Sequence, residues 1–348
     1  MRLTDSGRKQ GGLPRSSRGA AAVVGARAGP AILLALGLAG CSGQQSALAP
    51  AGEGAERLAS LFWTMSAGAV VIWALVVGAA VYASRLRPGP HSERIGRVLL
   101  WGGTAFSTAV LTGLLVFGLM LMPDLRAAGD RLKITVSGEQ WWWRVRYLAP
   151  GGSGPIESAN EVRLPLGQRV ELELTSPDTI HSFWIPPLGG KVDMIPGRVT
   201  RLVLEPTRTG TFRGACAEFC GTSHALMAFS VVVLEEAAFE DWLADEAAPA
   251  TAPGSAAEAL GQELFLQVGC GACHTVRGTA ADGTIGPDLT HLARRATLGA
   301  GTLPNSSDAL VRWIAHTEAI KPDVRMPSFG ALPDEHIEAI AAYLEGLE

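Results

Sequence analysis

The sequence predicts a multi-domain membrane protein with three parts: a transmembrane hairpin of two helices, a β-sandwich or barrel, and an all-α domain. Two long apolar stretches stand in the N-terminal third, short segments of alternating polarity follow, and segments with helical spacing come last. The 348 residues allow two or three domains, and a hydrophobic fraction of 47% is high for a wholly soluble protein. The formal net charge of −4 gives no indication of nucleic-acid binding.

Residues 1–40 have the features of an export signal. Arginines precede an apolar run that begins at Ala31, and Leu-Ala-Gly then leads directly into Cys41. This arrangement resembles a bacterial lipoprotein signal peptide, which is cleaved before the cysteine that receives the lipid. We therefore expect the mature protein to begin at lipidated Cys41.

The next segment, residues 41–129, contains two uncharged apolar stretches, at 61–84 and 98–122. Each stretch is long enough to cross about 30 Å of hydrocarbon as a helix. The short connection between them contains four arginines, Arg85, Arg87, Arg94 and Arg97. A short arginine-rich loop stays on the cytoplasmic side, so we expect a multi-pass protein of the bacterial inner membrane whose soluble domains both lie on the periplasmic or extracellular side.

Residues 130–245 consist of short segments in which polar and apolar residues alternate. The clearest of these are at 132–136, 170–174, 200–204 and 229–233, and Gly and Pro residues separate them. A period of two between such turn residues is typical of half-buried strands. The pattern predicts an antiparallel β-sandwich or barrel.

One loop of this β region has the ligand chemistry of a soft-metal site. Cys216, Cys220, His224 and Met227 follow one another at spacings of four, four and three residues. Thiolate, imidazole and thioether ligands are typical of electron-transfer copper. One copper of that kind needs a single cysteine, so two cysteines and the upstream His181 indicate two coppers that share two bridging sulfurs. A disulfide or a structural zinc site is the alternative, although neither explains Met227 or His181.

Residues 246–258 are rich in Ala and Pro, a composition that is typical of a linker. It predicts that the domains on either side move semi-independently. The remaining residues, 259–348, show helical spacing, with helices expected near 258–268, 308–317 and 334–347. We therefore expect an all-α domain at the C-terminus.

This domain contains the haem c attachment pattern Cys-Gly-Ala-Cys-His. Cys270 and Cys273 would bond to the porphyrin, and His274 would ligate the iron. Met326 is the single methionine of the domain, and as the second axial ligand it would raise the haem potential. A redox pair or half of a zinc site is the alternative for the motif. The alternatives to Met326 are three histidines, His291, His316 and His336.

The copper-type loop resembles the binuclear copper (CuA) loop of cytochrome c oxidase subunit II. The similarity covers residues from about 60 to 245 and includes the run Gln-Trp-Trp-Trp at 140–143, His181 and residues 191–198. It implies a cupredoxin-like fold for the β domain. The all-α domain resembles a class I cytochrome c, because Gly-Pro-Asp-Leu follows the haem motif at a typical distance.

The resemblance implies specific roles for the residues of the loop. The copper ligands would be His181, Cys216, Cys220, His224 and Met227. Glu218 would contribute its backbone carbonyl to one copper and its carboxylate to a Mg²⁺ or Mn²⁺ ion shared with subunit I; a solvated side chain is the alternative. Trp141 would be the ring through which electrons reach the copper, and an aromatic belt at the membrane interface is the alternative.

The expected function is that of subunit II of a respiratory haem–copper oxidase with a fused cytochrome c. Electrons would come from cytochrome c or the cytochrome bc complex and pass through the haem c and CuA to subunit I, where oxygen is reduced to water and protons are translocated. Subunit I, other oxidase subunits and the lipid membrane are the expected partners. The alternatives are an electron-accepting subunit of a nitric-oxide-reducing relative and a membrane-anchored copper-delivery protein. A quinol-oxidase subunit would lack the copper ligands.

Overall fold

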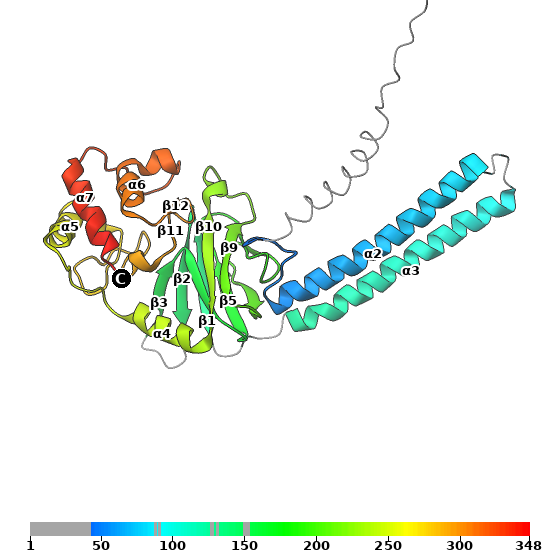
Figure 1. Ribbon diagram of the computed structural model, residues 1–348, viewed down its shortest axis with the longest axis horizontal. Coiled ribbons are helices and arrows are strands. Elements are labelled where there is room, and N and C mark those ends of the chain that lie inside the picture. The colour runs from blue at the N-terminus through cyan, green and yellow to red at the C-terminus, as the bar shows by residue number, and fades with distance from the viewer. Residues whose placement is uncertain (1–42, 87–88, 90–91, 126–128, 130–131, 149–153) are drawn as a thin grey trace, which may run out of the picture. The chain divides into compact units, whose positions relative to one another are not determined.

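The computed structural model describes residues 43–86, 89, 92–125, 129, 132–148 and 154–348 (Figure 1). Residues Gln44–Glu348 form one compact unit. The expected signal peptide and Cys41 lie outside the described residues, so lipidation of Cys41 stays a prediction.

Two long helices, α2 (Glu53–Val81) and α3 (Glu93–Leu125), correspond to the two apolar stretches (Figure 1). The last turn of α2 continues as a π-helix over Tyr82–Leu86. By length and composition both helices are able to cross a membrane, with a mean hydropathy of 2.1 in each. Their large apolar side chains are exposed, for example Trp73 at 67% and Trp101 at 70%, as expected for surfaces that contact lipid.

The β domain is a sandwich of two five-stranded sheets. The first sheet contains β3 (Ile156–Ala159), β2 (Trp142–Leu148), β1 (Lys133–Glu139), β5 (Val170–Thr175) and β8 (Thr200–Leu204), in that spatial order. The second contains β4 (Glu161–Pro165), β10 (Ala228–Leu234), β9 (Gly210–Cys216), β6 (His181–Trp184) and β7 (Val192–Met194). The predicted sandwich is confirmed.

Two strand pairs differ from the antiparallel arrangement that the sequence predicts. β1 and β5 are parallel, with Ile134 opposite Leu172, and β10 and β4 are parallel, with Val231 opposite Val162. The alternation of polar and apolar residues determines which face of a strand is buried, but it does not determine the direction of the neighbouring strand. The direction depends on the connections, which the pattern does not report.

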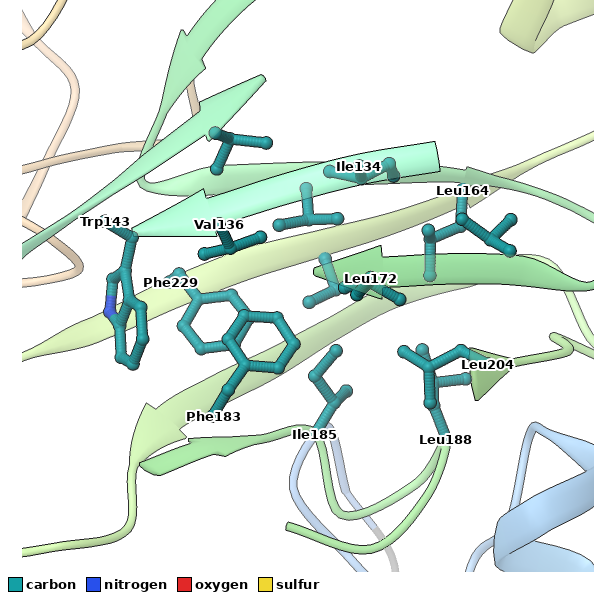
Figure 2. Close-up of a cluster of buried hydrophobic side chains, with 14 of the residues drawn as sticks. Ile134, Val136, Trp143, Leu164, Leu172, Phe183, Ile185, Leu188, Leu204 and Phe229 are labelled. Atoms are coloured by element: carbon teal, nitrogen blue, oxygen red, sulfur yellow. The ribbon is translucent and has the colours of Figure 1, made fainter. Parts of the chain in front are cut away.

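Aromatic rings fill part of the sandwich core (Figure 2), and the same core cluster includes Cys216, Cys220 and Met227 of the copper-type loop. Phe183 of β6 and Phe229 of β10 stack at 4.5 Å between ring centroids. Trp143 of β2 meets both rings edge-on, at 5.5 Å and 5.0 Å. Because these rings come from both sheets and are fully buried, they fix the strands that carry the metal-type ligands.

The C-terminal domain is built on three helices, α5 (Ala256–Gln267), α6 (Ser307–Ile320) and α7 (Asp334–Glu345). A two-stranded hairpin of β11 (Thr297–Leu298) and β12 (Leu303–Pro304) accompanies them. α5 and α7 approach closely because Gly261 lies between them: a Cβ there would come within 1.9 Å of the Ala339 carbonyl oxygen. The predicted helical domain is confirmed. The hairpin was not predicted, because strands of two residues are too short to show an alternation of polar and apolar residues.

The linker segment lies between α4 (Glu236–Ala247) and α5. Its composition predicts semi-independent domains, but hydrogen bonds join the domains on either side. Arg144 of β2 donates to the Thr284 carbonyl at 2.9 Å, and the amide of Ala228 in β10 donates to the Ala300 carbonyl at 2.9 Å. The composition of a linker describes only the linker, and it contains no information on whether the flanking surfaces fit each other.

Candidate metal and haem sites

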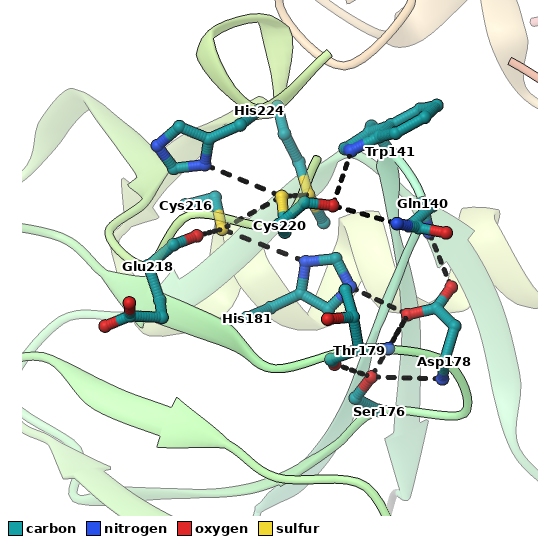
Figure 3. A network of polar contacts seen from close by, with 11 residues as sticks. Gln140, Trp141, Ser176, Asp178, Thr179, His181, Cys216, Glu218, Cys220 and His224 are labelled. Atoms are coloured by element: carbon teal, nitrogen blue, oxygen red, sulfur yellow. Dashed lines mark hydrogen bonds and ion pairs between the residues drawn. The ribbon is translucent and has the colours of Figure 1, made fainter. Parts of the chain in front are cut away.

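The metal-type ligands converge in one buried cluster (Figure 3). Ligand atoms of His181, Cys216 and Cys220 all lie within 4.8 Å of one another. The two sulfurs are 3.8 Å apart, and Nδ1 of His181 is 3.8 Å from the sulfur of Cys216. On the other side, the sulfur of Cys220 is 3.5 Å from Nδ1 of His224 and 3.8 Å from the sulfur of Met227.

The separation of the two sulfurs favours a shared metal. A disulfide requires about 2.05 Å, and both Cys216 and Cys220 are free. Metal–thiolate bonds are about 2.3 Å long, so two sulfurs 3.8 Å apart can ligate the same ion. Because a thioether completes the set, the donors suit copper better than zinc.

The strands of the second sheet hold the ends of the loop. His181 begins β6 and Cys216 ends β9, while Met227 directly precedes β10. The amide of Cys216 donates to the Met227 carbonyl at 2.9 Å, so the chain leaves and re-enters the sheet at adjacent positions. A ligand set held by paired strands moves little, which is what electron transfer requires of a metal site.

Asp178 orients the imidazole of His181. The carboxylate lies 2.9 Å from Nε2 and also accepts the amide hydrogens of Gln140 and Thr179 (Figure 3). Burial opposes a charged imidazole, but the hydrogen bonds with Asp178 and Cys216 outweigh it and raise the pKa of His181 to about 9. Burial likewise opposes ionisation of Asp178, yet the hydrogen bonds from His181 and the two amides lower its pKa to about 2. With Nε2–H held by the carboxylate, Nδ1 is free to bind a metal.

Cys216 and Cys220 influence each other's ionisation. A hydrogen bond joins the two sulfurs, and it lowers the pKa of Cys216 although burial opposes the shift. The same contact raises the pKa of Cys220, with burial acting in the same direction. The metal-free site therefore favours one thiolate, the form that binds a soft metal.

Glu218 presents its two functional groups to different surroundings. Its backbone carbonyl oxygen lies 3.2 Å from the sulfur of Cys216, so this oxygen faces the cluster. Its carboxylate is 45% exposed and lies 3.6 Å from the ammonium of Lys191. The carbonyl is thus placed as a candidate ligand, and the carboxylate faces outward from the domain.

Two further residues control the space around the cluster: Gly138, which no sequence motif included, and Gln140, which belongs to the run at 140–143 but had no role assigned to it. Gly138 of β1 lies against His181, where a Cβ would come within 3.0 Å of the ring. Gln140 donates from its side chain to the Cys220 carbonyl at 2.8 Å. Gly138 lies two residues beyond the predicted strand segment 132–136 but within the observed strand β1, where a glycine is a signal for close approach.

Trp141 lies between the metal-type cluster and the C-terminal domain. Its Nε1 donates to the Cys220 carbonyl at 3.0 Å, and the residue is only 6% exposed. It also lines a cavity of about 460 Å³ whose other walls include Cys270, Cys273 and Met326. Of the tryptophan run, Trp141 therefore contacts both places where a redox cofactor would bind.

The cavity brings together the four residues expected to hold a haem. Cys270 and Cys273 are free and half-buried, and His274 and Met326 line the same space. The cavity volume of about 460 Å³ lies within the range of about 300–1,000 Å³ that is usual for cofactor sites. Its lining is mostly apolar, with side chains such as Phe265, Leu289 and Ile340, which suits a porphyrin.

Local interactions orient the imidazole of His274, the predicted iron ligand. Its Nδ1 lies 2.8 Å from the Pro287 carbonyl, which leaves Nε2 available, and burial lowers its pKa so that the neutral form is favoured. Gly286 is required beside it, since a Cβ there would come within 2.6 Å of the ring. In the Gly-Pro pair that follows the haem motif, the glycine therefore leaves room for the His274 ring and the proline supplies the carbonyl that the ring contacts.

Arg295 also fits a bound haem. The side chain lines the cavity and is buried, and its Nε has no hydrogen-bond partner among the described residues. Its Nη2 donates to the Asp288 carbonyl at 2.5 Å, and burial lowers its pKa. A carboxylate, which a haem carries, would satisfy this buried donor.

The alternative axial histidines lie elsewhere in the domain. The described lining of the cavity includes none of the three, His291, His316 and His336. His291 has both ring nitrogens occupied, since Nδ1 lies 2.8 Å from the Glu348 carbonyl and Nε2 3.1 Å from the Ala248 carbonyl. The arrangement favours Met326 over a second histidine.

Comparison with known proteins identifies both soluble domains. Residues 143–235 match the family described as cytochrome c oxidase subunit II, periplasmic domain, and residues 258–348 match the cytochrome c family. Cytochrome c oxidase subunit 2 of Alkalihalophilus pseudofirmus is 30% identical over 340 residues, which cover 92% of this chain and 96% of that protein. The Bacillus subtilis subunit 2 is 31% identical over 233 residues, 64% of each chain. A crystal structure of the periplasmic domain of subunit II from Bradyrhizobium japonicum is 30% identical, covers 34% of this chain and 95% of that one, and gives a TM-score of 0.32.

Proposed function

Because this chain belongs to the cytochrome c oxidase subunit II family, we propose that it passes electrons from a haem c in its own C-terminal domain, through a binuclear copper centre, to subunit I. The family implies copper in the β domain, the cytochrome c domain implies haem, and membership of an oxidase implies association with other subunits. Oxygen reduction to water and proton translocation would take place in subunit I. Cytochrome c or the cytochrome bc complex would supply the electrons.

The donor set supports copper at the buried cluster. The proposed ligands are His181, Cys216, Cys220, His224, Met227 and the carbonyl of Glu218. When bound, the two coppers supply a site that exchanges one electron. Asp178 and the paired ends of β9 and β10 hold the ligands in place, which keeps reorganisation small. Cys216 and Cys220 are only 7% and 3% exposed, which argues against a copper-delivery protein that must hand its metal over.

The cavity supports a covalently attached haem in the C-terminal domain. We propose that Cys270 and Cys273 bond to the porphyrin and that His274 and Met326 ligate the iron. When bound, the haem supplies a one-electron carrier whose potential is raised by a thioether ligand. Arg295 would donate to a haem carboxylate, and Pro287 would orient His274.

Trp141 carries the proposed electron path. This residue lines the haem-type cavity and also donates to the carbonyl of Cys220, a proposed copper ligand. It therefore bridges the two sites without an intervening segment of chain. Subunit I would receive the electron on the opposite side, where Glu218 is exposed beside Lys191 and would contribute its carboxylate to a shared Mg²⁺ or Mn²⁺.

The placement in the cell follows from the helices and from the family. We propose that α2 and α3 cross the bacterial inner membrane as a hairpin within residues 41–129, after cleavage before Cys41. The copper domain (130–245), the linker (246–258) and the cytochrome c domain (259–348) would then lie on the periplasmic or extracellular side.

The direction of electron flow is testable in the purified oxidase complex. Stopped-flow reduction should show the haem reduced first and the copper second, with two coppers and one haem per chain by metal analysis. Trp141→Leu should slow haem-to-copper transfer and leave both metal spectra unchanged. Trp142→Leu is the matched control, because Trp142 also lines the cavity but lies against Arg144 at 4.6 Å and, within the described part of the chain, makes no hydrogen bond to the copper loop. Copper reduced as fast in a complex that lacks the haem domain, with no cytochrome added, would exclude the proposed path.

A further inference from the structure

We propose that Lys321 is a positioning residue that holds the haem domain on the copper loop, so that the chain's own haem domain, and not a separate donor protein, covers Trp141. This inference rests on the proposed function. Lys321 follows the last residue of α6 and belongs to the haem domain, yet it contacts the copper domain directly.

The ammonium group of Lys321 is buried and makes three hydrogen bonds. Nζ donates to the carbonyls of Trp141 at 2.7 Å, Leu226 at 2.8 Å and Gly299 at 2.7 Å, and the residue is 1% exposed. These bonds use all three of its donors. A buried ammonium is costly unless every donor is paired, so this geometry is what makes its burial tolerable.

The three carbonyls come from both domains. Gly299 belongs to the haem domain, whereas Trp141 and Leu226 belong to the copper domain and lie 180 and 95 residues away from Lys321 in the sequence. Leu226 is adjacent to the proposed ligand Met227. One side chain therefore joins the haem domain to the backbone of Trp141 and to the copper loop at the same time.

A tight turn of the haem domain, residues 299–301, completes the contact. Gly299, Ala300 and Gly301 all have positive φ values, of 58°, 61° and 81°. Ala300 is fully buried, and its carbonyl accepts the amide hydrogen of Ala228 at 2.9 Å. A non-glycine residue in this conformation costs free energy, so surrounding contacts must stabilise it. The carbonyl that Gly299 presents to Lys321 is part of this same turn.

A neighbouring bond reinforces the arrangement. The hydroxyl of Ser223, one residue before the proposed ligand His224, donates to the Pro322 carbonyl at 2.6 Å. We call the turn 299–301 together with Lys321 and Pro322 the latch. With the latch in place Trp141 is 6% exposed, which leaves a diffusing donor almost no ring surface to contact. Electrons would then reach the copper through the attached haem.

The experiment compares Lys321→Met with the wild-type oxidase complex. Methionine keeps the length of the side chain and removes the charge and the donors. Hydrogen exchange at the amide of Ala228 reports whether the domains are joined, and flash reduction of the haem reports the rate of haem-to-copper transfer. We expect the protection of this amide to fall at least about tenfold, as loss of charge-assisted hydrogen bonds predicts, and electron transfer to slow and become dependent on viscosity.

Two other variants separate the latch from general effects. Gly301→Val should have the same consequences without altering any charge, because the residue has a positive φ and a Cβ would come within 3.0 Å of Ala228. Lys133→Met is the matched control, since Lys133 is half-exposed on β1 and pairs with Glu171 and Glu173. It should leave exchange and electron transfer unchanged. The copper spectrum should be the same in all variants. Lys321 also lines the haem-type cavity, so Gly301→Val, whose position is not part of the described lining, is the latch variant whose haem spectrum should match that of wild type.

The outcomes distinguish the latch from the proposed function. Wild-type transfer rates together with full protection of Ala228 in Lys321→Met would overturn the inference. Slower transfer with full protection would also overturn it, because Lys321 would then act on electron transfer without positioning the domain. Absence of haem-to-copper transfer in the wild-type complex would contradict the proposed function instead, while the exchange comparison would still test the latch.

Discussion

Replacing Asp178 by Asn should weaken copper binding while the β domain stays folded. Asp178 accepts hydrogens from Nε2 of His181 at 2.9 Å and from the amide of Gln140 at 2.8 Å, through different carboxylate oxygens. In asparagine one of these oxygens becomes an NH₂ group, so a donor would face a donor on one side. The imidazole of His181 then loses its hydrogen bond to residue 178, or residue 178 loses the hydrogen bond from the Gln140 amide that holds it in place.

The magnitude follows from the position of Asp178 behind a proposed metal ligand, His181. Loss of such a partner typically lowers metal affinity by about 10–100-fold, which corresponds to about 1.4–2.7 kcal/mol. The side chain of Asp178 is only 16% exposed, so water replaces the lost hydrogen bond poorly and we expect the upper half of this range. Competition with a copper chelator measures the affinity, and electron paramagnetic resonance measures the geometry of the site.

Asp193→Asn is the matched control. Asp193 is 46% exposed and pairs with Lys191 at 3.4 Å, away from the His181 ring, so its substitution should leave copper affinity unchanged. Copper affinity within about twofold of wild type in Asp178→Asn, with an unchanged spectrum, would refute the orienting role, since the expected loss is at least tenfold.

The same pair predicts a pH dependence in the metal-free protein. The pKa of Asp178 is lowered from 3.8 to about 2, so its stabilising effect is present above the ordinary value and is lost as pH falls through about 2. The pKa of His181 is raised from 6.5 to about 9, so its contribution is present below the ordinary value and is lost as pH rises through about 9. Thermal melting of the metal-free protein across this range should show both losses in wild type. In Asp178→Asn the acid loss should be absent and the alkaline loss smaller, because Cys216 still raises the pKa of His181.

Three further substitutions test other parts of the structure. Gly138→Ala should displace the ring of His181, because the added Cβ would come within 3.0 Å of it; a changed copper spectrum checks this, and an unchanged spectrum with normal affinity contradicts it. Met326→Ala should change the axial ligation and lower the haem potential while covalent attachment persists, as a redox titration and an optical spectrum would show; an unaltered potential would point to another ligand. Cys41→Ser should abolish lipid attachment and leave both metal sites intact, and intact-mass measurement of the membrane form decides whether residues before Cys41 are retained.

Much of the architecture is readable from the sequence because it depends on local patterns. The apolar stretches, the alternating segments and the helical spacing each have a characteristic period, and the fold that they predict is confirmed. The resemblance to the subunit II family is likewise confirmed, since its motifs occupy a single short loop and one haem-attachment pattern. That both long helices cross a membrane stays a prediction.

The parts that sequence reasoning missed depend on residues that meet only in the folded chain. The partners of Lys321 lie up to 180 residues away, and its neighbours in the sequence give no sign of burial. Asp178 stands three residues before His181, a spacing that is common for unrelated reasons, so only the 2.9 Å contact assigns it a role. The parallel pairing of β1 with β5 could not be predicted for the same reason, because the alternation of polar and apolar residues within a strand does not show which strand lies next to it or in which direction.

The close approach of α5 and α7 at Gly261 also has a consequence for the biogenesis of the protein. The proposed haem-attachment cysteines follow α5 closely, and the same cavity is lined by Ile340 and Leu344 of α7, which comes about 60 residues later in the sequence. We therefore expect Cys270 and Cys273 to be synthesised before this part of the cavity. The two thiols would be accessible for haem attachment until α7 packs against α5, and that packing would complete the cavity.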